Sequence, residues 1–222
     1  MVALRGAARV VSVNVGEVRE LKWRDRIHHT AIDKKPVAGR RGIHSLGVDG
    51  DVQGDRSCHG GIDKAVYAFA SEHYDYWAEW LGTPIGPGAF GENLTLEGVT
   101  EDEVCIGDRL RFGSALLEVS EPRQPCLTFA ALHRREDLPK SFADAGWPGI
   151  YFRVVEEGDV EAGDPVTRVA RGPSDWTVRR VFRMIMGREP MPANVDHLLD
   201  HPALADASRQ ALVNRRRSVR EA

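Results

Sequence analysis

Apolar residues in the first 170 positions recur in short runs separated by glycine, a pattern that predicts many short β-strands. Two Gly-Asp pairs, Gly107-Asp108 and Gly163-Asp164, each introduce one of these runs. Many short strands with turn signals between them are typical of a barrel or a sandwich. We therefore expect a mainly β fold with a few short helices. The predicted strands span residues 8–15, 65–70, 94–96, 109–112, 116–120, 149–156 and 166–170.

Two helices are predicted within this strand-rich part. Ser71 can cap a helix in which Tyr74, Trp77, Ala78 and Leu81 fall on one face. At this spacing the aromatic rings are more often core than ligand-stacking residues. A second short helix is predicted to begin at Cys126, since apolar residues dominate 127–132. The glycine-rich stretch 39–54 is expected to be largely loop.

The pattern changes to helical periodicity after Gly172-Pro173. Apolar positions over 178–186 form one stripe that ends at Gly187, and a second short helix is expected over 195–199. Pro202 suits the first turn of a third helix that reaches the C-terminus. We therefore predict a β-barrel domain over 1–172 and a three-helix domain over 173–222. So small a bundle is expected to dock on the barrel or on a neighbouring copy, as in a homodimer.

Composition narrows the functional classes. The chain has 222 residues and a formal net charge of −3, so no overall positive field favours nucleic acid. The basic cluster in 215–220 lies near a predicted helix end, where solvated cations are common. Three cysteines cannot supply a four-cysteine cluster. The start of the chain lacks a signal-peptide pattern, and no apolar stretch is long enough to cross a membrane. We expect a cytoplasmic protein.

Cys126 carries the strongest chemical signal. It follows Pro122, Arg123 and Pro125, and the two prolines fix φ on either side of the arginine. A thiol at a helix N-terminus with a nearby guanidinium is favoured in its thiolate form. A thiolate is both a nucleophile and a ligand for a soft metal. Cys105 lies among apolar residues and is expected to be a buried small side chain.

Two glycine-rich runs add candidate binding residues. In 54–66, the pair Gly60-Gly61 can form a backbone nest for an anion, with His59 and Lys64 adding donors. A tight turn with solvated side chains explains the same run equally well. In 88–94, Asn93 follows Gly91-Glu92 and can both donate to and accept from the edge of a pterin or a base. Alternatively, Asn93 caps the turn before the next strand.

In this order, the motifs resemble those of the MOSC domain family, and within it the YiiM type. The tail from Ser174-Asp175 onward is similar to the three-helix appendage of that type. The resemblance therefore spans nearly the whole chain. The matching motifs are Gly50-Asp51 with Gly54-Asp55, His59-Gly60-Gly61 followed by Asp63-Lys64-Ala65-Val66, Phe90-Gly91-Glu92-Asn93-Leu94, and Pro122-Arg123 with Pro125-Cys126.

The resemblance implies a MOSC-type β-barrel, a bound molybdenum cofactor (molybdopterin) and reduction of N-hydroxylated compounds such as hydroxylaminopurine base analogues. Cys126 is then the molybdenum ligand or a sulfur acceptor. Arg123 stabilises the thiolate or the cofactor phosphate, and His59 or Glu92 handles protons. The implied cofactor-binding residues are His59, Gly60, Gly61, Asp63, Lys64, Gly91, Asn93 and Arg123.

Electrons must come from an external donor reductase, because the chain shows neither a dinucleotide fingerprint nor iron–sulfur ligands. Two other functions stay open. One is a carrier that holds the cofactor or a persulfide sulfur without turnover. The other is a metal-free cysteine hydrolase, which needs His59 or His133 as a base beside Cys126.

Overall fold

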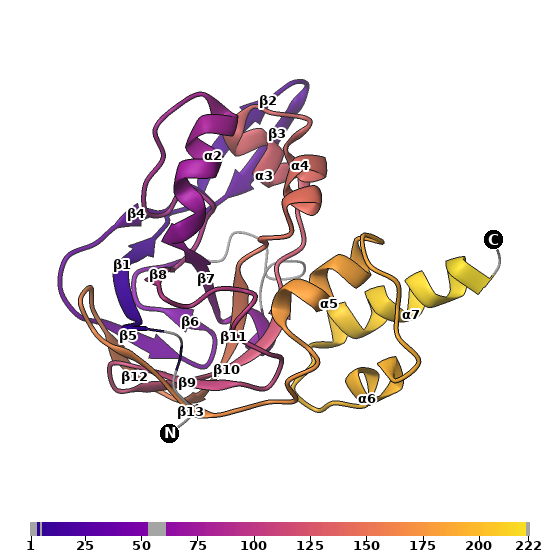
Figure 1. The fold of residues 1–222 in the computed structure, drawn as a ribbon. Helices are drawn as coiled ribbons and strands as arrows, with labels where there is room; N and C mark the ends of the chain where they lie inside the picture. Colours follow the sequence, from indigo (N-terminus) through magenta and orange to yellow (C-terminus); the bar gives the residue numbers. More distant parts are fainter. Residues whose placement is uncertain (1–3, 5, 53–60, 221–222) are drawn as a thin grey trace.

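The computed structural model describes residues 4, 6–52 and 61–220, and these are organised around one large curled sheet (Figure 1). Eight strands follow the order β13-β9-β10-β11-β7-β8-β1-β4. The β7–β8 pair is parallel and the other neighbours are antiparallel, so the sheet is mixed. Its strands are β1 (Arg9–Val15), β4 (Lys35–Pro36), β7 (Val66–Ala70), β8 (Leu94–Glu97), β9 (Arg109–Phe112), β10 (Ala115–Pro122), β11 (Ile150–Glu156) and β13 (Val166–Ala170).

All seven predicted strands are present, each within one or two residues of its expected bounds. Two hairpins were missed. The first consists of β2 (Arg19–Trp23) and β3 (Arg26–Thr30), and its side chains are half-buried or exposed, so it lacks an alternating apolar pattern. The second joins β5 (Arg41–His44) to β6 (Gly47–Val48) inside the stretch predicted as loop, and β12 (Gly158–Val160) pairs with it.

The sequence predicted a mainly β fold with a β-barrel domain. The described residues instead form a mixed α/β fold with more strand than helix, and no closed barrel is found among them. The sheet nevertheless curls so far that the start of β1 meets the chain just before β13. Val10 N–H donates to Asp164 O (2.9 Å), and Val166 N–H donates to Ala8 O (2.8 Å). Only one isolated bridge, Arg9 with Pro165, forms there. The other end of β1 pairs with β4, so no continuous ladder closes the sheet.

Three short helices lie together at the top of the molecule in Figure 1, and an aromatic cluster packs between them and the sheet. The helices are α2 (Tyr74–Leu81), preceded by the 3-10 turn η2 (Ser71–His73), α3 (Leu127–His133) and α4 (Leu138–Ala145). Phe69, Phe90, Phe129 and Trp77 are fully buried in this cluster, whereas Tyr76 is 43% exposed. The aromatic stripe predicted over 74–81 is therefore mainly core.

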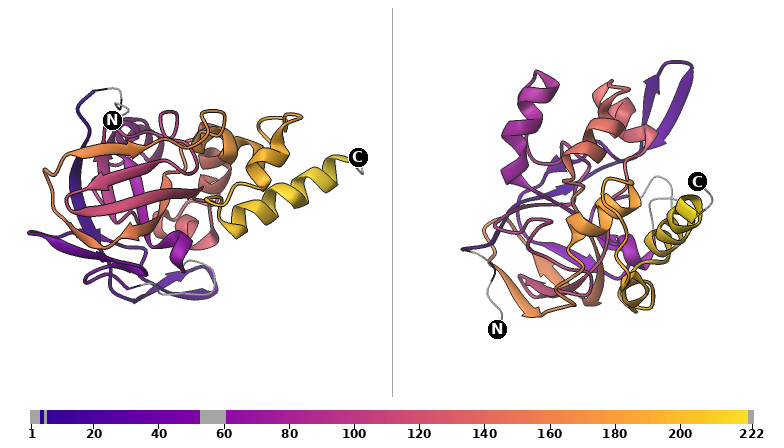
Figure 2. Two further views of the ribbon diagram at one scale, coloured as in Figure 1. Left: turned by 90° about the horizontal axis from the view of Figure 1, so that it is seen from below. Right: turned by 45° about the vertical axis from the view of Figure 1, so that its right-hand side comes forward.

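The C-terminal helices α5 (Val178–Ile185) and α6 (Val195–Leu199) match their predictions, but α7 (Asp206–Arg220) begins four residues after Pro202. The chain makes turns between Pro202 and Ala205 before it becomes helical. Val181 and Leu212 share a hydrophobic core with the sheet residues. Figures 1 and 2 show α7 projecting outward, with its first turn beside the sheet. A domain boundary at residue 172 stays a prediction.

His133, at the end of α3, is held as a neutral side chain at the edge of the aromatic cluster. Its ring packs against Phe129 and Phe90, with centroids 5.2 and 5.8 Å away. Its Nε2–H donates to Ala89 O at 2.9 Å. Burial lowers the pKa of His133 to about 4.

This shift predicts a loss of stability in acid. The unfolded histidine titrates near a pKa of about 6.5, so below that pH the unfolded state binds a proton that the folded state does not. The resulting stability is complete above that pH and falls as the pH drops toward 4. At about pH 5 the loss amounts to roughly 2 kcal/mol. Urea unfolding of wild type and His133→Gln should therefore diverge between pH 7 and pH 5. Parallel pH dependences in the two proteins would refute a buried neutral His133.

Candidate functional site

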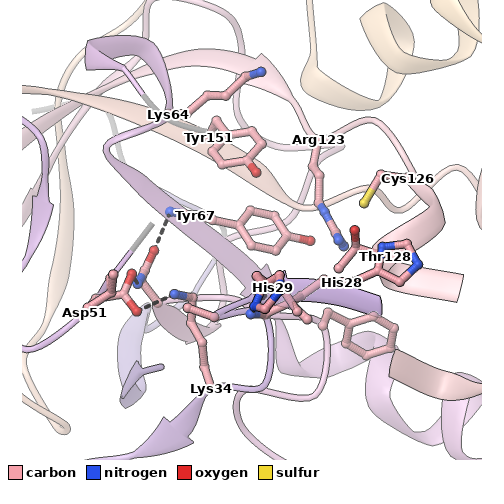
Figure 3. Close-up of a pocket in the computed structure, with 17 residues that line it drawn as sticks. His28, His29, Lys34, Asp51, Lys64, Tyr67, Arg123, Cys126, Thr128 and Tyr151 are labelled. Atoms are coloured by element: carbon pink, nitrogen blue, oxygen red, sulfur yellow. Dashed lines mark hydrogen bonds and ion pairs between the residues drawn. The ribbon is translucent and has the colours of Figure 1, made fainter. Parts of the chain in front are cut away.

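A pocket of about 220 Å³ opens between the β2–β3 hairpin, the sheet and the start of α3 (Figure 3). Residues far apart in the sequence meet there, and most of the polar ones are basic, phenolic or amide side chains. The lining residues are His28, His29, Thr30, Ala31, Ile32, Lys34, Asp51, Val52, Lys64, Tyr67, Phe90, Gly91, Asn93, Arg123, Cys126, Thr128 and Tyr151.

Cys126 stands at the wall of this pocket, immediately before α3 as predicted. Its backbone is extended (φ −131°, ψ 167°), and Ala130 N–H donates to its carbonyl at 3.3 Å. The thiol is partly exposed. Cys105, by contrast, is 3% exposed, and burial raises the pKa of its thiol to about 11. The prediction of Cys105 as a buried small side chain is confirmed.

Arg123 brings a buried positive charge to the same wall. It is 4% exposed, and its guanidinium lies 4.3 Å from the ring centroid of Phe129 and 5.1 Å from that of Tyr67. Figure 3 shows the guanidinium extending beside the Cys126 sulfur and the Tyr67 hydroxyl. Burial alone would lower the pKa of Arg123. Tyr67, Cys126 and Tyr151 together outweigh burial and raise this pKa above its usual value, so the guanidinium stays charged.

One nitrogen of this cation, Nη1, is buried and has no hydrogen-bond partner within the described part of the chain. A buried donor on a charged group is costly to leave unpaired. Because this donor lies on a side chain that lines the pocket, the arrangement favours an anionic or strongly accepting group beside Cys126.

Two tyrosines form the wall between Arg123 and Lys64. The ring centroids of Tyr67 and Tyr151 are 5.0 Å apart. The Tyr67 hydroxyl donates to Pro148 O at 2.9 Å. Burial raises the pKa of Tyr151 to about 12 and that of Tyr67 further still. Both phenols are therefore neutral at pH 7.

The opposite side of the pocket is a closed polar network centred on Asp51. Its Oδ1 pairs with Lys34 and accepts from Gly16 N–H (2.8 Å), and its Oδ2 accepts from Asn93 Nδ2 (2.8 Å). Asn93 Oδ1 in turn accepts from Tyr67 N–H at 3.2 Å. Burial lowers the pKa of Lys34, and Asp51 opposes that shift. Asn93 thus fixes the strand edge and also lines the pocket.

The other sequence-predicted residues separate into three groups. Lys64 and Gly91 line the pocket, and a Cβ added to Gly91 would lie 2.7 Å from Ile32 Cγ1. Gly61 and Asp63 belong to η1 (Ile62–Lys64) and its N-cap but do not line the pocket. His59 and Gly60 lie outside the described residues.

Glu92 lies behind the pocket rather than on its surface. It is fully buried, and its carboxylate accepts from Tyr74 Oη (2.5 Å), Gly88 N–H (2.8 Å) and Phe90 N–H (2.9 Å). Burial raises the pKa of Glu92. Glu92 therefore acts as a structural brace: its hydrogen bonds to Gly88 and Phe90 fix the turn that places Gly91 at the pocket.

Several lining residues were not predicted from the sequence. His28 and His29 lie on β3, in the hairpin that was not predicted. Two adjacent histidines in the sequence were the one local sign of a binding role. Lys34 and Tyr151 gave no local signal, because their neighbours in the pocket come from distant strands.

The pocket provides one thiol but no cage of protein ligands. No group of three or more His, Cys, Asp or Glu residues able to hold a metal occurs in the described residues. Within the described residues, Cys126 is the one soft metal ligand that the pocket offers. His133 directs its Nε2–H toward Ala89 O, and its low pKa is that of a buried neutral ring, an arrangement unlike that of a base serving Cys126. Among the described helices, none is long and apolar enough to span a membrane.

Comparisons with known proteins assign the family. The MOSC domain family matches residues 55–167. The protein YflK of Bacillus subtilis is 34% identical over 207 residues, which cover 93% of this chain and 94% of YflK. The crystal structure of YiiM from Geobacillus stearothermophilus has a TM-score of 0.79 and 38% identity, covering 94% of this chain and 98% of YiiM.

A third relative carries an activity in its name. A protein of Gibberella moniliformis named "Reductase" is 35% identical over 163 residues. The match covers 72% of this chain but only 29% of the fungal protein. The family match, the near full-length relatives and the shared fold lead to one conclusion: the chain belongs to the MOSC domain family and is of the YiiM type.

Proposed function

We propose that this protein is a molybdenum-cofactor-dependent reductase of N-hydroxylated compounds, with Cys126 as a protein ligand of the metal. The observation that carries the proposal is the placement of the Cys126 thiol beside the buried, incompletely paired guanidinium of Arg123 in one pocket. Membership of the MOSC domain family and the name of the fungal relative support it.

The donor set fits a molybdopterin. A thiolate suits a soft metal, and a dithiolene cofactor brings the further sulfur ligands that the described residues do not provide. Arg123 and Lys64 are cations suited to a phosphate. The Tyr151 hydroxyl, together with the remaining lone pairs of Tyr67 Oη and Asn93 Oδ1, offers neutral hydrogen-bonding groups suited to the edge of a pterin.

When bound, the cofactor supplies the two-electron chemistry that converts an N–OH group and two protons into an amine and water. The chain's own residues orient the reactants and set the local charge. Arg123 favours the thiolate form of Cys126, because a cation beside a thiol stabilises its anion. The β2–β3 hairpin covers one side of the pocket and brings His28 and His29 within reach of a substrate.

The remaining reactants come from outside the chain. Electrons are supplied by an external reductase, and the fungal relative carries most of its length beyond the matched part. The substrate class is a small N-hydroxylated compound. We place the protein in the cytoplasm, where such a donor and reduced thiols coexist.

Cys126→Ala should remove both metal and turnover. Protein expressed with an intact cofactor pathway is expected to bind about one molybdenum per chain and to reduce an N-hydroxylamine when given an artificial electron donor. Metal analysis and amine formation measure the two properties. The variant loses both, because no other thiol among the described residues lines the pocket.

Cys105→Ala is the matched control, since that thiol is buried away from the pocket and its loss should leave metal content unchanged. Full metal and activity in Cys126→Ala would refute the ligand role. Molybdenum bound by wild type without turnover would instead favour the carrier function.

Arg123→Met should slow alkylation of Cys126 by iodoacetamide at pH 7 by about tenfold, because the reactive thiolate loses the adjacent cation that stabilises it. The same variant should retain less molybdopterin after gel filtration. Arg123→Lys keeps the charge and should preserve part of both properties.

Arg135→Met is the control, because the Arg135 guanidinium lies 4.1 Å from the ring centroid of Trp80 in a comparable stacking geometry, but Arg135 is only half-buried and lies outside the pocket. Equal alkylation rates in wild type and Arg123→Met would show that the guanidinium does not act on the thiol.

A further inference from the structure

Lys64 is anchored from a part of the chain far along the sequence. It belongs to η1, whereas the segment 202–208 forms the turn before α7 and its first residues. Three residues on β10 and β11 stand between these two segments, and each contacts both of them. The three are Ser120, Glu121 and Arg153.

Ser120 joins the two segments through its hydroxyl and its backbone. Its Oγ–H donates to Asp63 O at 2.6 Å. Its carbonyl accepts from Ala205 N–H at 3.1 Å. Ser120 is fully buried, so these bonds are not in competition with water.

Arg153 makes the second connection. Its Nη2 lies 2.7 Å from Asp63 Oδ1 in an ion pair. The same guanidinium donates to Ala203 O (3.0 Å) and Pro202 O (3.2 Å) on the other side. A guanidinium can hold both groups at once because its donors are fixed in one plane.

Glu121 makes the third connection and reaches the pocket residue itself. Its Oε1 lies 3.8 Å from Lys64 Nζ. Its Oε2 accepts from Ser208 Oγ–H at 2.8 Å. Glu121 is 1% exposed and Ser208 is fully buried, so the carboxylate has little freedom to move. The hydroxyl of α7 thus fixes the carboxylate that faces the ammonium of Lys64.

We infer that the segment 202–208 is part of the functional site, with Ser208 and Glu121 as positioning residues that hold Lys64 for the anionic group of its ligand. The segment lies outside the 55–167 match to the MOSC domain family, so the family match does not account for it. The inference rests on the proposed function only in taking Lys64 as a phosphate contact. It gives the C-terminal helices a role in binding.

The test is a double-mutant cycle on the full-length, metal-free protein, with inorganic phosphate as the probe and calorimetry as the readout. Ser208→Ala changes no charge and should weaken phosphate binding by about threefold to tenfold, the range expected for one hydrogen bond. Lys64→Met should weaken it at least as much. In the Lys64→Met background, Ser208→Ala should have no further effect, since it acts through Lys64.

Ser218→Ala, on the exposed part of the same helix, is the matched control and should leave binding unchanged. Arg153→Gln tests the second connection and should also weaken binding in the Lys64-containing protein. An undiminished affinity in Ser208→Ala, or an equal loss with and without Lys64, would overturn the inference, as would wild type that binds no phosphate. The cycle needs no molybdenum, so its outcome is separate from that of the proposed reductase activity.

Discussion

The site depends on keeping one positive charge inside the protein. Moving a guanidinium out of water is costly unless the surroundings replace its hydration. Here the aromatic faces of Phe129, Tyr67 and Phe142 replace it on one side, with ring centroids 4.3 to 5.9 Å from the charge. The other side is turned to the pocket, where one donor has no hydrogen-bond partner among the described residues. The aromatic cluster under α2 to α4 is therefore part of the site as well as part of the core.

The pocket is also a meeting point of several rigid supports. The Asp51 network fixes one side, the Glu92 brace shapes the turn at Gly91, and η1 is tied to the start of α7. Each support consists of connected buried hydrogen bonds, which strengthen one another in a low-dielectric interior. A ligand entering the pocket would thus meet groups that are already in place, which reduces the ordering cost of binding.

The sequence predicted the strands well because burial of one face produces alternation, and it predicted Cys126 and Arg123 because their signals are local. It missed the β2–β3 hairpin, whose exposed strands carry no such alternation. It predicted a β-barrel, whereas the sheet of the described residues does not close, because contacts between distant residues decide which strands pair at the edges. Glu92 looked like a pocket acid because it adjoins Gly91, but its side chain turns into the core. His28 and Tyr151 join the site only through tertiary packing.

The central claim is that the Cys126 sulfur binds the metal of a molybdenum cofactor beside Arg123. X-ray absorption at the molybdenum edge tests it directly, because it counts the sulfur atoms around the metal. We predict one more sulfur ligand in wild type than in Cys126→Ser reconstituted with excess cofactor, where Arg123 and Lys64 still contact the phosphate. Identical sulfur counts in the two proteins would contradict the account.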